Sequence, residues 1–175
     1  MGEAQAGAID RKLFRKVMSS FATGVTVITT HTRGEVRGMT ANAFMSGSLD
    51  PPLCIISVAT RARMHAFLLE AGHFGVSILA QGQERLSTHF SGRPEPEFFP
   101  KFVHVGQTPL LADASAALAA EIIARHDCGD HSIFIGRIVH LRAHSRVPLV
   151  VHDGRYASLM YVEELGAPVP IIEFW

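Results

Sequence analysis

The sequence predicts one domain that is mainly β, flanked by a few short helices, and three observations lead to this. The chain has 175 residues, enough for one substantial core and too few for two ordinary domains. Strand-length runs of β-branched and apolar residues recur between turn residues, whereas helical periodicity is confined to short segments. Hydrophobic residues make up 47% and charged residues 18% of the chain, and this apolar surplus predicts burial at a subunit interface.

The first elements expected are a helix and a β-hairpin. Apolar residues at helical spacing predict an amphipathic helix that runs to about Ser20. Val25–Thr30 is rich in β-branched residues, and a turn signal over Thr32–Glu35 leads to a second run that begins at Val36. These two runs predict the hairpin. The apolar residues of the helix are Ile9, Leu13, Phe14, Val17, Met18 and Phe21.

The middle of the chain predicts strands that alternate with short helices. The extended Asp50-Pro51-Pro52 segment leads into an apolar strand over Leu53–Val58. A helix is expected over Ala62–Ala71, ended by Gly72, and a strand over Phe74–Leu79. A further short helix is expected over Gln83–Phe90.

The segments after Phe90 predict less regular structure. A loop at the surface or at an interface is expected around Pro94, Pro96, Pro100 and Pro109. The alanines of Asp113–Arg125 favour a helix by propensity, and the alternative is a long strand that pairs with Ser132–Arg142. A short strand over Leu149–His152 follows.

Composition and the N-terminal segment bear on the partners and the location of the protein. Sixteen basic residues balance sixteen acidic ones without a basic stripe, so no nucleic-acid partner is expected. Met1–Gly7 has neither the basic nor the apolar region of a signal peptide, and no apolar run approaches the roughly 20 residues of a membrane span. Cys54 in an apolar run and Cys128 in a polar turn form no disulfide framework, which predicts a cytoplasmic location.

A polar block supplies the main candidate binding site. Gly38–Phe44 (GMTANAF) and Ser48–Pro52 (SLDPP) place small side chains on a strand-turn-strand that can lie against a flat polar ring. Ala41 and Ala43 allow a ring to approach closely, and the alternative is a plain polar turn. The hydroxyl and amide groups of the block belong to Thr40, Asn42, Ser46 and Ser48.

The next candidate is an anion site where a strand ends and a helix begins, over Ser57–His65. Free N–H groups and the helix dipole attract an anion there, Thr60 is placed to cap the helix, and Arg61 or Arg63 is placed to neutralise a phosphate. A solvated basic turn is the alternative. The chain has no GxGxxG and no GxxxxGK[ST] motif, so neither a Rossmann site nor a P-loop is indicated.

Two later turns carry polar groups. His131 ends the Gly129-Asp130-His131 turn, and Gly154-Arg155-Tyr156 places Arg155 to meet a phosphate and Tyr156 to stack on a ring. A hairpin turn with Tyr156 anchored in the core is the alternative. His126, Cys128, Asp130 and His131 are metal-ligand types, but they share one turn without a second cluster, so no metal is expected.

The block Gly38–Pro52 is followed by the turns Gly129–His131 and Gly154–Tyr156, and these motifs in this order resemble the flavin reductase domain family. The resemblance covers roughly residues 14–160. The resemblance implies one domain over 1–175 with a tail at 161–175, an FMN-binding split β-barrel of Greek-key type, and a strand at Asp113–Arg125. It implies a homodimer with flavin at the interface, and nicotinamide contact by His131. The flavin-binding residues it implies are Thr40, Ala41, Asn42, Ser46, Ser48, Leu49, Ser57, Val58, Ala59, Thr60, Arg63, Arg155 and Tyr156.

The resemblance implies NADH- or NADPH-dependent reduction of free FMN or FAD, with reduced flavin passing to a partner flavin-dependent monooxygenase. The protein's own contribution would be orientation of the two rings, because the redox chemistry belongs to them. One alternative is a flavoredoxin-like electron carrier or small oxidase with tightly bound FMN. Another is a split-barrel module that binds flavin or haem without turnover.

Overall fold

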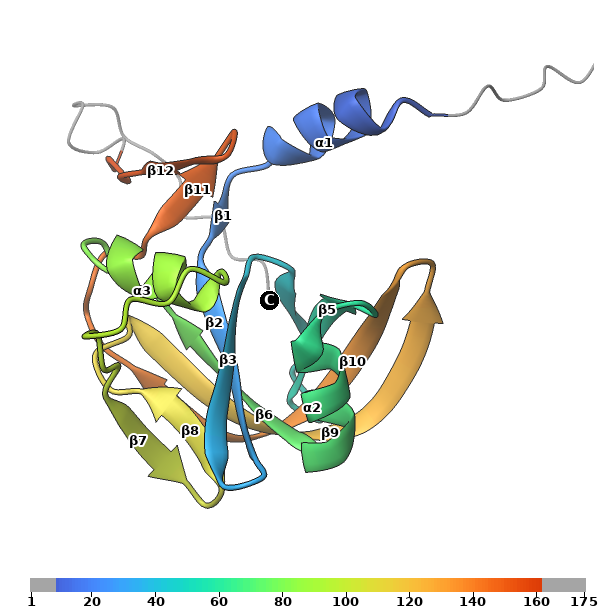
Figure 1. The fold of residues 1–175 in the computed structure, drawn as a ribbon, viewed down its shortest axis with the longest axis vertical. Helices are drawn as coiled ribbons and strands as arrows, with labels where there is room; N and C mark the ends of the chain where they lie inside the picture. The colour runs from blue at the N-terminus through green and yellow to red at the C-terminus, as the bar shows by residue number, and fades with distance from the viewer. Residues whose placement is uncertain (1–8, 162–175) are drawn as a thin grey trace, which may run out of the picture.

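The protein is built on one curled antiparallel sheet, which the computed structural model describes within residues 9–161 (Figure 1). Seven strands lie in the order β3-β2-β6-β9-β10-β5-β4. The expected tail after Tyr161 and the Met1–Gly7 segment lie outside the described residues. The seven strands are β2 (Thr26–Thr32), β3 (Glu35–Ala41), β4 (Phe44–Ser48), β5 (Leu53–Ala59), β6 (His73–Ile78), β9 (Ala116–Cys128) and β10 (His131–Ala143).

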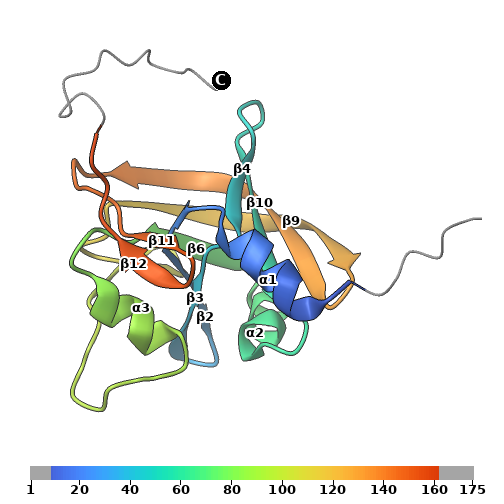
Figure 2. The same ribbon diagram turned by 90° about the horizontal axis from the view of Figure 1, so that it is seen from above.

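The two edge strands of this sheet are consecutive in the sequence. β3 forms one edge, β4 forms the other, and only Asn42 and Ala43 separate them. The sheet therefore curls until its edges meet, which makes a split barrel, and the chain crosses back to β6 through α2 (Arg63–Ala71) in a Greek-key order. α2 contacts both β3 and β5, and Figure 1 shows it beside β5, with the same helix seen from above in Figure 2. The predicted mainly β split barrel is confirmed.

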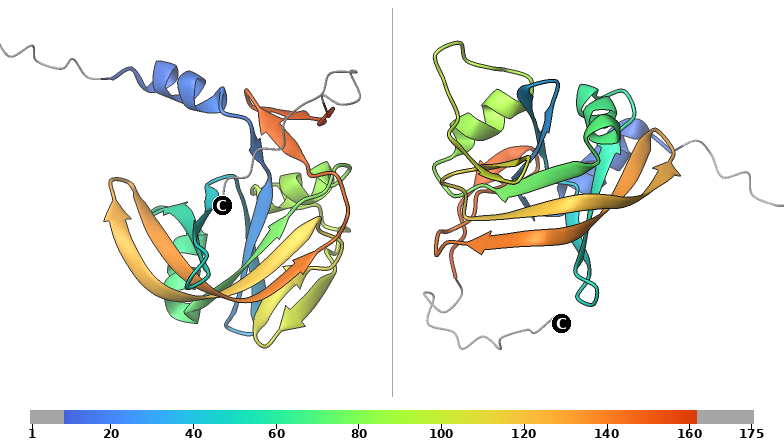
Figure 3. Two further views of the ribbon diagram at one scale, coloured as in Figure 1. Left: turned by 180° about the vertical axis from the view of Figure 1, so that it is seen from behind. Right: turned by 90° about the horizontal axis from the view of Figure 1, so that it is seen from below.

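The longest strands are β9 and β10, of 13 residues each, which form a curved ribbon across the sheet (Figure 3). The segment at Asp113–Arg125 is therefore a strand, as the resemblance implies. β9 pairs with both β6 and β10, and this pairing outweighs the helix propensity of its alanines.

Apolar side chains fill two cores on the two faces of the central strands. The first lies under α2, where Met64 and Leu68 are buried against Ile56, Phe74 and Phe134. The second lies under α3 (Glu84–Phe90) and includes Val27, Leu79 and Leu149. Because Ile28 faces the first core and Val27 the second, β2 is buried on both faces and holds the barrel together.

One hairpin is absent from the sequence prediction. The proline-containing loop holds β7 (Phe102–Val105) and β8 (Thr108–Leu111), which pair with each other. All of β8 is buried, so the expectation of a surface loop is wrong at Pro109. The proline lacks an N–H, but β8 pairs in its own sheet on one side only, so the proline interrupts no central ladder. Runs of four residues are too short to give a strand pattern.

The remaining elements lie at one end of the barrel. α1 (Arg11–Ser19) stands outside it, joined through β1 (Thr23–Gly24), which pairs with β11 (Val150–His152) (Figure 1). β12 (Arg155–Ala157) completes this small sheet. Cys54 is fully buried and Cys128 is exposed, and burial raises the pKa of the Cys54 thiol to about 11. Within residues 9–161, no helix has the length and apolar character that crossing a membrane requires.

The contact between β6 and β8 leads to a prediction at Gly75. A Cβ there would lie 2.6 Å from the Pro109 carbonyl oxygen and 2.7 Å from Thr29 Oγ1, so Gly75→Ala forces the backbone apart. We expect this variant to lower the free energy of unfolding by about 1–3 kcal/mol in urea denaturation. The matched control is Gly24→Ala, where nothing lies within 4 Å and the change should stay within about 0.5 kcal/mol. Equal stabilities for the two variants would contradict the packing.

Candidate active site

The first part of the candidate site is a pocket between the end of β3, α3 and the β11–β12 hairpin. Its volume is about 360 Å³, and it is open to solvent at Asn42 and Tyr156. β3 is an edge strand, so one side of its backbone has no strand partner, and its N–H and C=O groups are free for a ligand. The lining residues are Val25, Thr40, Ala41, Asn42, Ser87, Ser91, Val151, Gly154 and Tyr156.

Two predicted residues of this pocket are tied to the same residue of α3. Thr40 Oγ1 donates a hydrogen bond to the Ser87 carbonyl oxygen at 2.6 Å, and Tyr156 Oη donates to Ser87 Oγ at 2.9 Å. Tyr156 is 46% exposed, so the alternative of a core anchor is wrong and its ring forms a wall of the pocket. The hydroxyl protons of Thr40 and Tyr156 are both engaged in these hydrogen bonds. Among the predicted residues that line this pocket, Asn42 therefore has the side-chain donor that remains for a ligand.

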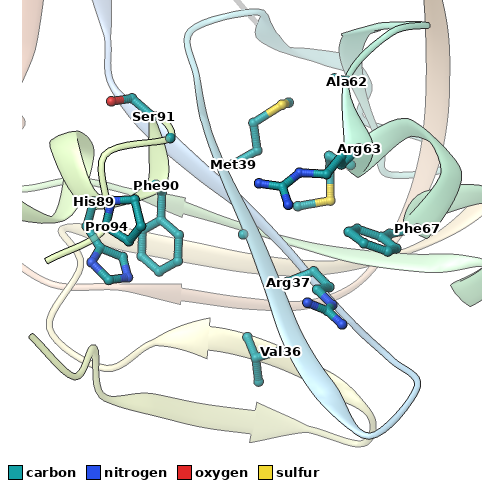
Figure 4. Close-up of a pocket in the computed structure, with 13 residues that line it drawn as sticks. Val36, Arg37, Met39, Ala62, Arg63, Phe67, His89, Phe90, Ser91 and Pro94 are labelled. Carbon is teal, nitrogen blue, oxygen red and sulfur yellow. The ribbon is translucent and has the colours of Figure 1, made fainter. Parts of the chain in front are cut away.

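A second pocket, of about 500 Å³, adjoins the first through Ser91 and along β3 (Figure 4). Figure 4 shows Arg63 and Phe67 of α2 on one side of β3, and His89 and Phe90 of α3 on the other. The Arg37 guanidinium lies 4.9 Å from the centroid of the Phe67 ring, a cation–π contact. Arg37 Nε is buried and has no hydrogen-bond partner within residues 9–161.

The basic groups of this second pocket have the chemistry to hold a phosphate. Arg63 begins α2, is exposed, and forms no ion pair among the described residues. The first turn of α2 contains no acidic residue, and its N-cap, Ala62, makes no side-chain hydrogen bond. The Arg63 guanidinium and the uncapped helix N-terminus therefore offer donors to one anion, whereas the Arg37 guanidinium is already paired with Glu35 at 2.5 Å.

Thr60 does not cap α2, so that part of the prediction is wrong. Its Oγ1 donates to the Asp130 carbonyl oxygen at 3.1 Å, and its backbone N–H donates to the same oxygen at 3.0 Å. Two residues separate Thr60 from the start of the helix, too far for a cap. Thr60 instead joins the β5–α2 connection to the β9–β10 turn and brings Arg61 close to His131.

His131 lies in a third pocket, of about 530 Å³, between that turn and α1. Its Nδ1 is 2.7 Å from Asp130 Oδ1, and the His131 side chain is 43% exposed. The hydrogen bond from His131, followed by the charge of its ring, lowers the pKa of Asp130 below its usual range. Asp130 is therefore an acceptor that orients the imidazole, with Nε2 left for a ligand. The lining residues are Ile9, Arg11, Phe14, Arg15, Arg61, Asp130 and His131.

The remaining predicted residues lie around these pockets rather than in them. On β4 and the turn after it, Ser46 and Leu49 are exposed and Ser48 is half-buried. Ser57 and Ala59 of β5 are half-buried, and the Ser57 N–H donates to the Ala43 carbonyl oxygen at 3.1 Å. The Val58 side chain is buried in the first core, so only its backbone remains for a ligand. Arg155 is exposed beside Tyr156 and lines none of the three pockets.

Several lining residues have no counterpart in the sequence prediction. Ser87 and Ser91 come from α3 and the residue after it, where nothing but their polarity distinguishes them. Arg37 and Phe67 face each other from β3 and α2, a pairing that only the fold reveals. Arg11 and Arg15 had a readable signal, since four-residue spacing places both on one face of α1. Within residues 9–161, no three His, Cys, Asp or Glu residues are grouped to hold a metal ion.

The chain is similar to known proteins over most of its length. Residues 18–160 match the family model of the flavin reductase like domain. The NADH-dependent flavin reductase of Rhodococcus sp is 41% identical over 172 residues, which cover 94% of this chain and 96% of that protein. The reductase component of 4-hydroxyphenylacetate 3-monooxygenase from Thermus thermophilus is 37% identical, over 86% of this chain and 98% of that one.

A solved structure agrees with these relatives. The flavin reductase PheA2 in its native state superposes with a TM-score of 0.84 at 39% identity, over 87% of this chain and 100% of that one. The family match spans the strands that form the barrel and all three pockets except for the α1 residues before Met18. This chain belongs to the flavin reductase like domain family.

Proposed function

We propose that this protein catalyses NADH- or NADPH-dependent reduction of free FMN or FAD and supplies the reduced flavin to a partner monooxygenase. Three pockets carry the proposal. A slot at a free strand edge adjoins a pocket that contains Arg63, and a pocket that contains His131 lies across the start of α2. These match the three needs of a ring, its phosphate and a second ring. The names of the reductase relatives support the same reaction.

The residues take separate roles in binding the flavin. The free edge of β3 at Thr40, Ala41 and Asn42 faces the ring, and Tyr156 bounds it. Arg63 binds the phosphate at the start of α2, with Thr60 fixing the adjoining connection. Peripheral contacts come from Ser46, Ser48, Leu49, Ser57, Val58, Ala59 and Arg155.

His131 orients the hydride donor. When both ligands are bound, the nicotinamide supplies a hydride from its C4 atom to N5 of the flavin. No side chain of this chain needs to move a proton in that step. Asp130 fixes the His131 ring through Nδ1, so that Nε2 can hold the carboxamide of the nicotinamide. The protein contributes orientation and apposition of the two rings.

A homodimer fits the distribution of apolar surface. The strands β4, β9 and β10 expose Met45 (58%), Ile123 (48%), Val139 (52%) and Leu141 (67%) on the barrel. α1 has no buried residue, and it also exposes Leu13, Val17 and Met18. A soluble chain gains by burying a surface of this kind against a second copy.

The first prediction concerns turnover. The purified protein should oxidise NADH or NADPH anaerobically only when FMN or FAD is added, with a rate that saturates in flavin, followed at the nicotinamide absorbance band. Oxidation that needs no added flavin, by a protein that purifies yellow, would indicate a carrier or oxidase with bound FMN. Flavin or haem binding without any oxidation would indicate a non-catalytic module.

The second prediction concerns the flavin phosphate. Arg63→Ala removes a charge-assisted hydrogen bond, worth about 1.5–3 kcal/mol, so the Kd of FMN should rise roughly tenfold or more. Riboflavin lacks the phosphate, and its Kd should not change. Flavin fluorescence quenching measures both constants. Lys101→Ala removes an equivalent charge outside the three pockets and serves as the control. An equal loss for FMN and riboflavin would place the phosphate elsewhere.

The third prediction concerns assembly. Sedimentation equilibrium should give twice the chain mass of 19.0 kDa. Introducing charges at the exposed β10 positions, in the double variant Val139→Glu and Leu141→Glu, should shift the protein to monomer because carboxylates oppose burial of this face. A wild-type mass of one chain at micromolar concentration would refute the dimer.

A further inference from the structure

The third pocket holds a concentration of positive charge that the proposed contact of His131 does not use. Arg11 and Arg15 of α1 and Arg61 before α2 line it, and Asp130 is the only carboxylate among its lining residues. Asp130 is already engaged with His131 at 2.7 Å. Three guanidinium groups therefore face a space of about 530 Å³ with one committed counter-charge.

Arg11, Arg15 and Arg61 lack the carboxylate partner that five other arginines of the described residues have. Arg33, Arg37, Arg85, Arg125 and Arg137 each have a carboxylate within 4 Å. Among residues 9–161, Arg11, Arg15 and Arg61 form no ion pair and donate no side-chain hydrogen bond. Like charges four residues apart on one helix face also weaken the helix. The repulsion between these arginines destabilises α1, and a bound anion would offset it.

The folding of the domain does not require α1 to lie there. The helix has no buried residue, and its Asp10 cap is local. Its C-terminal end is held by Ser19, whose carbonyl oxygen accepts from the Asp153 N–H at 2.9 Å and whose hydroxyl donates to Asp153 Oδ1 at 3.2 Å. Arg11 and Arg15 therefore form the outer side of the third pocket without packing on the core. Replacing them should leave the fold of the barrel intact.

We propose that α1 is part of the dinucleotide site, where Arg11, Arg15 and Arg61 bind the diphosphate of the nicotinamide dinucleotide. The diphosphate is a dianion, which matches the excess of guanidinium groups over carboxylate in this pocket. Phe14 lines the same pocket and is 55% exposed, so its ring offers a surface on which a base can stack. His131 places the nicotinamide end in the same pocket. This inference rests on the proposed function.

FAD also contains a diphosphate, so the two sources must be separated. The flavin phosphate has its own cation, Arg63, in the second pocket across the start of α2. His131, the residue proposed for the nicotinamide, belongs to the third pocket. We therefore assign the third pocket to the nicotinamide dinucleotide, and the comparison of FAD with FMN tests that assignment.

The decisive experiment uses the full chain with Arg11→Gln and Arg15→Gln combined. The KM for NADH should rise tenfold or more, since two charge-assisted hydrogen bonds are lost. The rate with 1-benzyl-1,4-dihydronicotinamide, which carries the reactive ring and no phosphate, should stay within twofold of wild type. The Kd of NAD⁺ from calorimetry should rise in parallel with the KM. Lys16→Gln, on another face of α1, is the matched control and should change none of these.

Each other outcome has a definite meaning. An unchanged KM for NADH and an unchanged Kd for NAD⁺ would overturn the inference while leaving the proposed function intact. A weaker Kd for FAD, with FMN and NAD⁺ unaffected, would also overturn it by assigning the pocket to the flavin. If the wild type failed to turn over any donor, the proposed function would fail, and the NAD⁺ titration of the variant would still decide whether these arginines bind the dinucleotide.

Discussion

The structure depends on one constraint, which is that the two edges of the seven-stranded sheet are joined by two residues. Asn42 and Ala43 connect β3 to β4, so the sheet has to curl until its first and last strands meet. Free sheet edges ordinarily invite association with other chains. Here the free side of β3 borders a pocket, and its unpaired backbone groups become the part of the protein that can bind a polar ring.

The same curl explains why the barrel can carry an open site without losing its core. β2 and β6 are buried on both faces, with α2 covering one core and α3 with the β7–β8 hairpin covering the other. Close approach at Gly75 and Gly136 lets these layers pack without a gap. Because both helices are fixed by packing, the N-terminus of α2 and the polar residues of α3 are held beside β3. The site is assembled from covering elements whose positions the core determines.

Sequence patterns predicted the local elements well where one residue carries the signal. Gly72 adopts a left-handed conformation, with φ of 70°, and ends α2 as expected. The alanine-rich strand β9 was ambiguous because its conformation is decided by two neighbouring strands rather than by its own residues. The β7–β8 hairpin was missed because its strands have four residues each and one contains Pro109.

The candidate site was predictable in outline but not in its pairings. Tyr156 does come together with Thr40, Ala41 and Asn42, although it lies far from them in the chain. The same pattern could not show that the Thr40 hydroxyl is engaged by Ser87, that Thr60 bonds to Asp130, or that the Val58 side chain points into the core. Periodicity tells which face of an element a residue occupies, and only the fold tells what that face meets.

The positions of Arg11, Arg15 and Arg63 explain how two phosphate-bearing ligands can share one small domain. Arg63, which is proposed to bind the flavin phosphate, lies at the start of α2, a helix packed on the core through Met64 and Leu68. Arg11 and Arg15 lie on a helix that contributes nothing to the core. A reductase that delivers its product must release flavin and spent dinucleotide in separate events. Placing one set of cations on rigid elements and the other on a helix anchored mainly at Ser19 allows the dinucleotide contacts to open while the flavin contacts stay in place. The two ligands can therefore leave separately because Arg63 lies on α2, whereas Arg11 and Arg15 lie on α1.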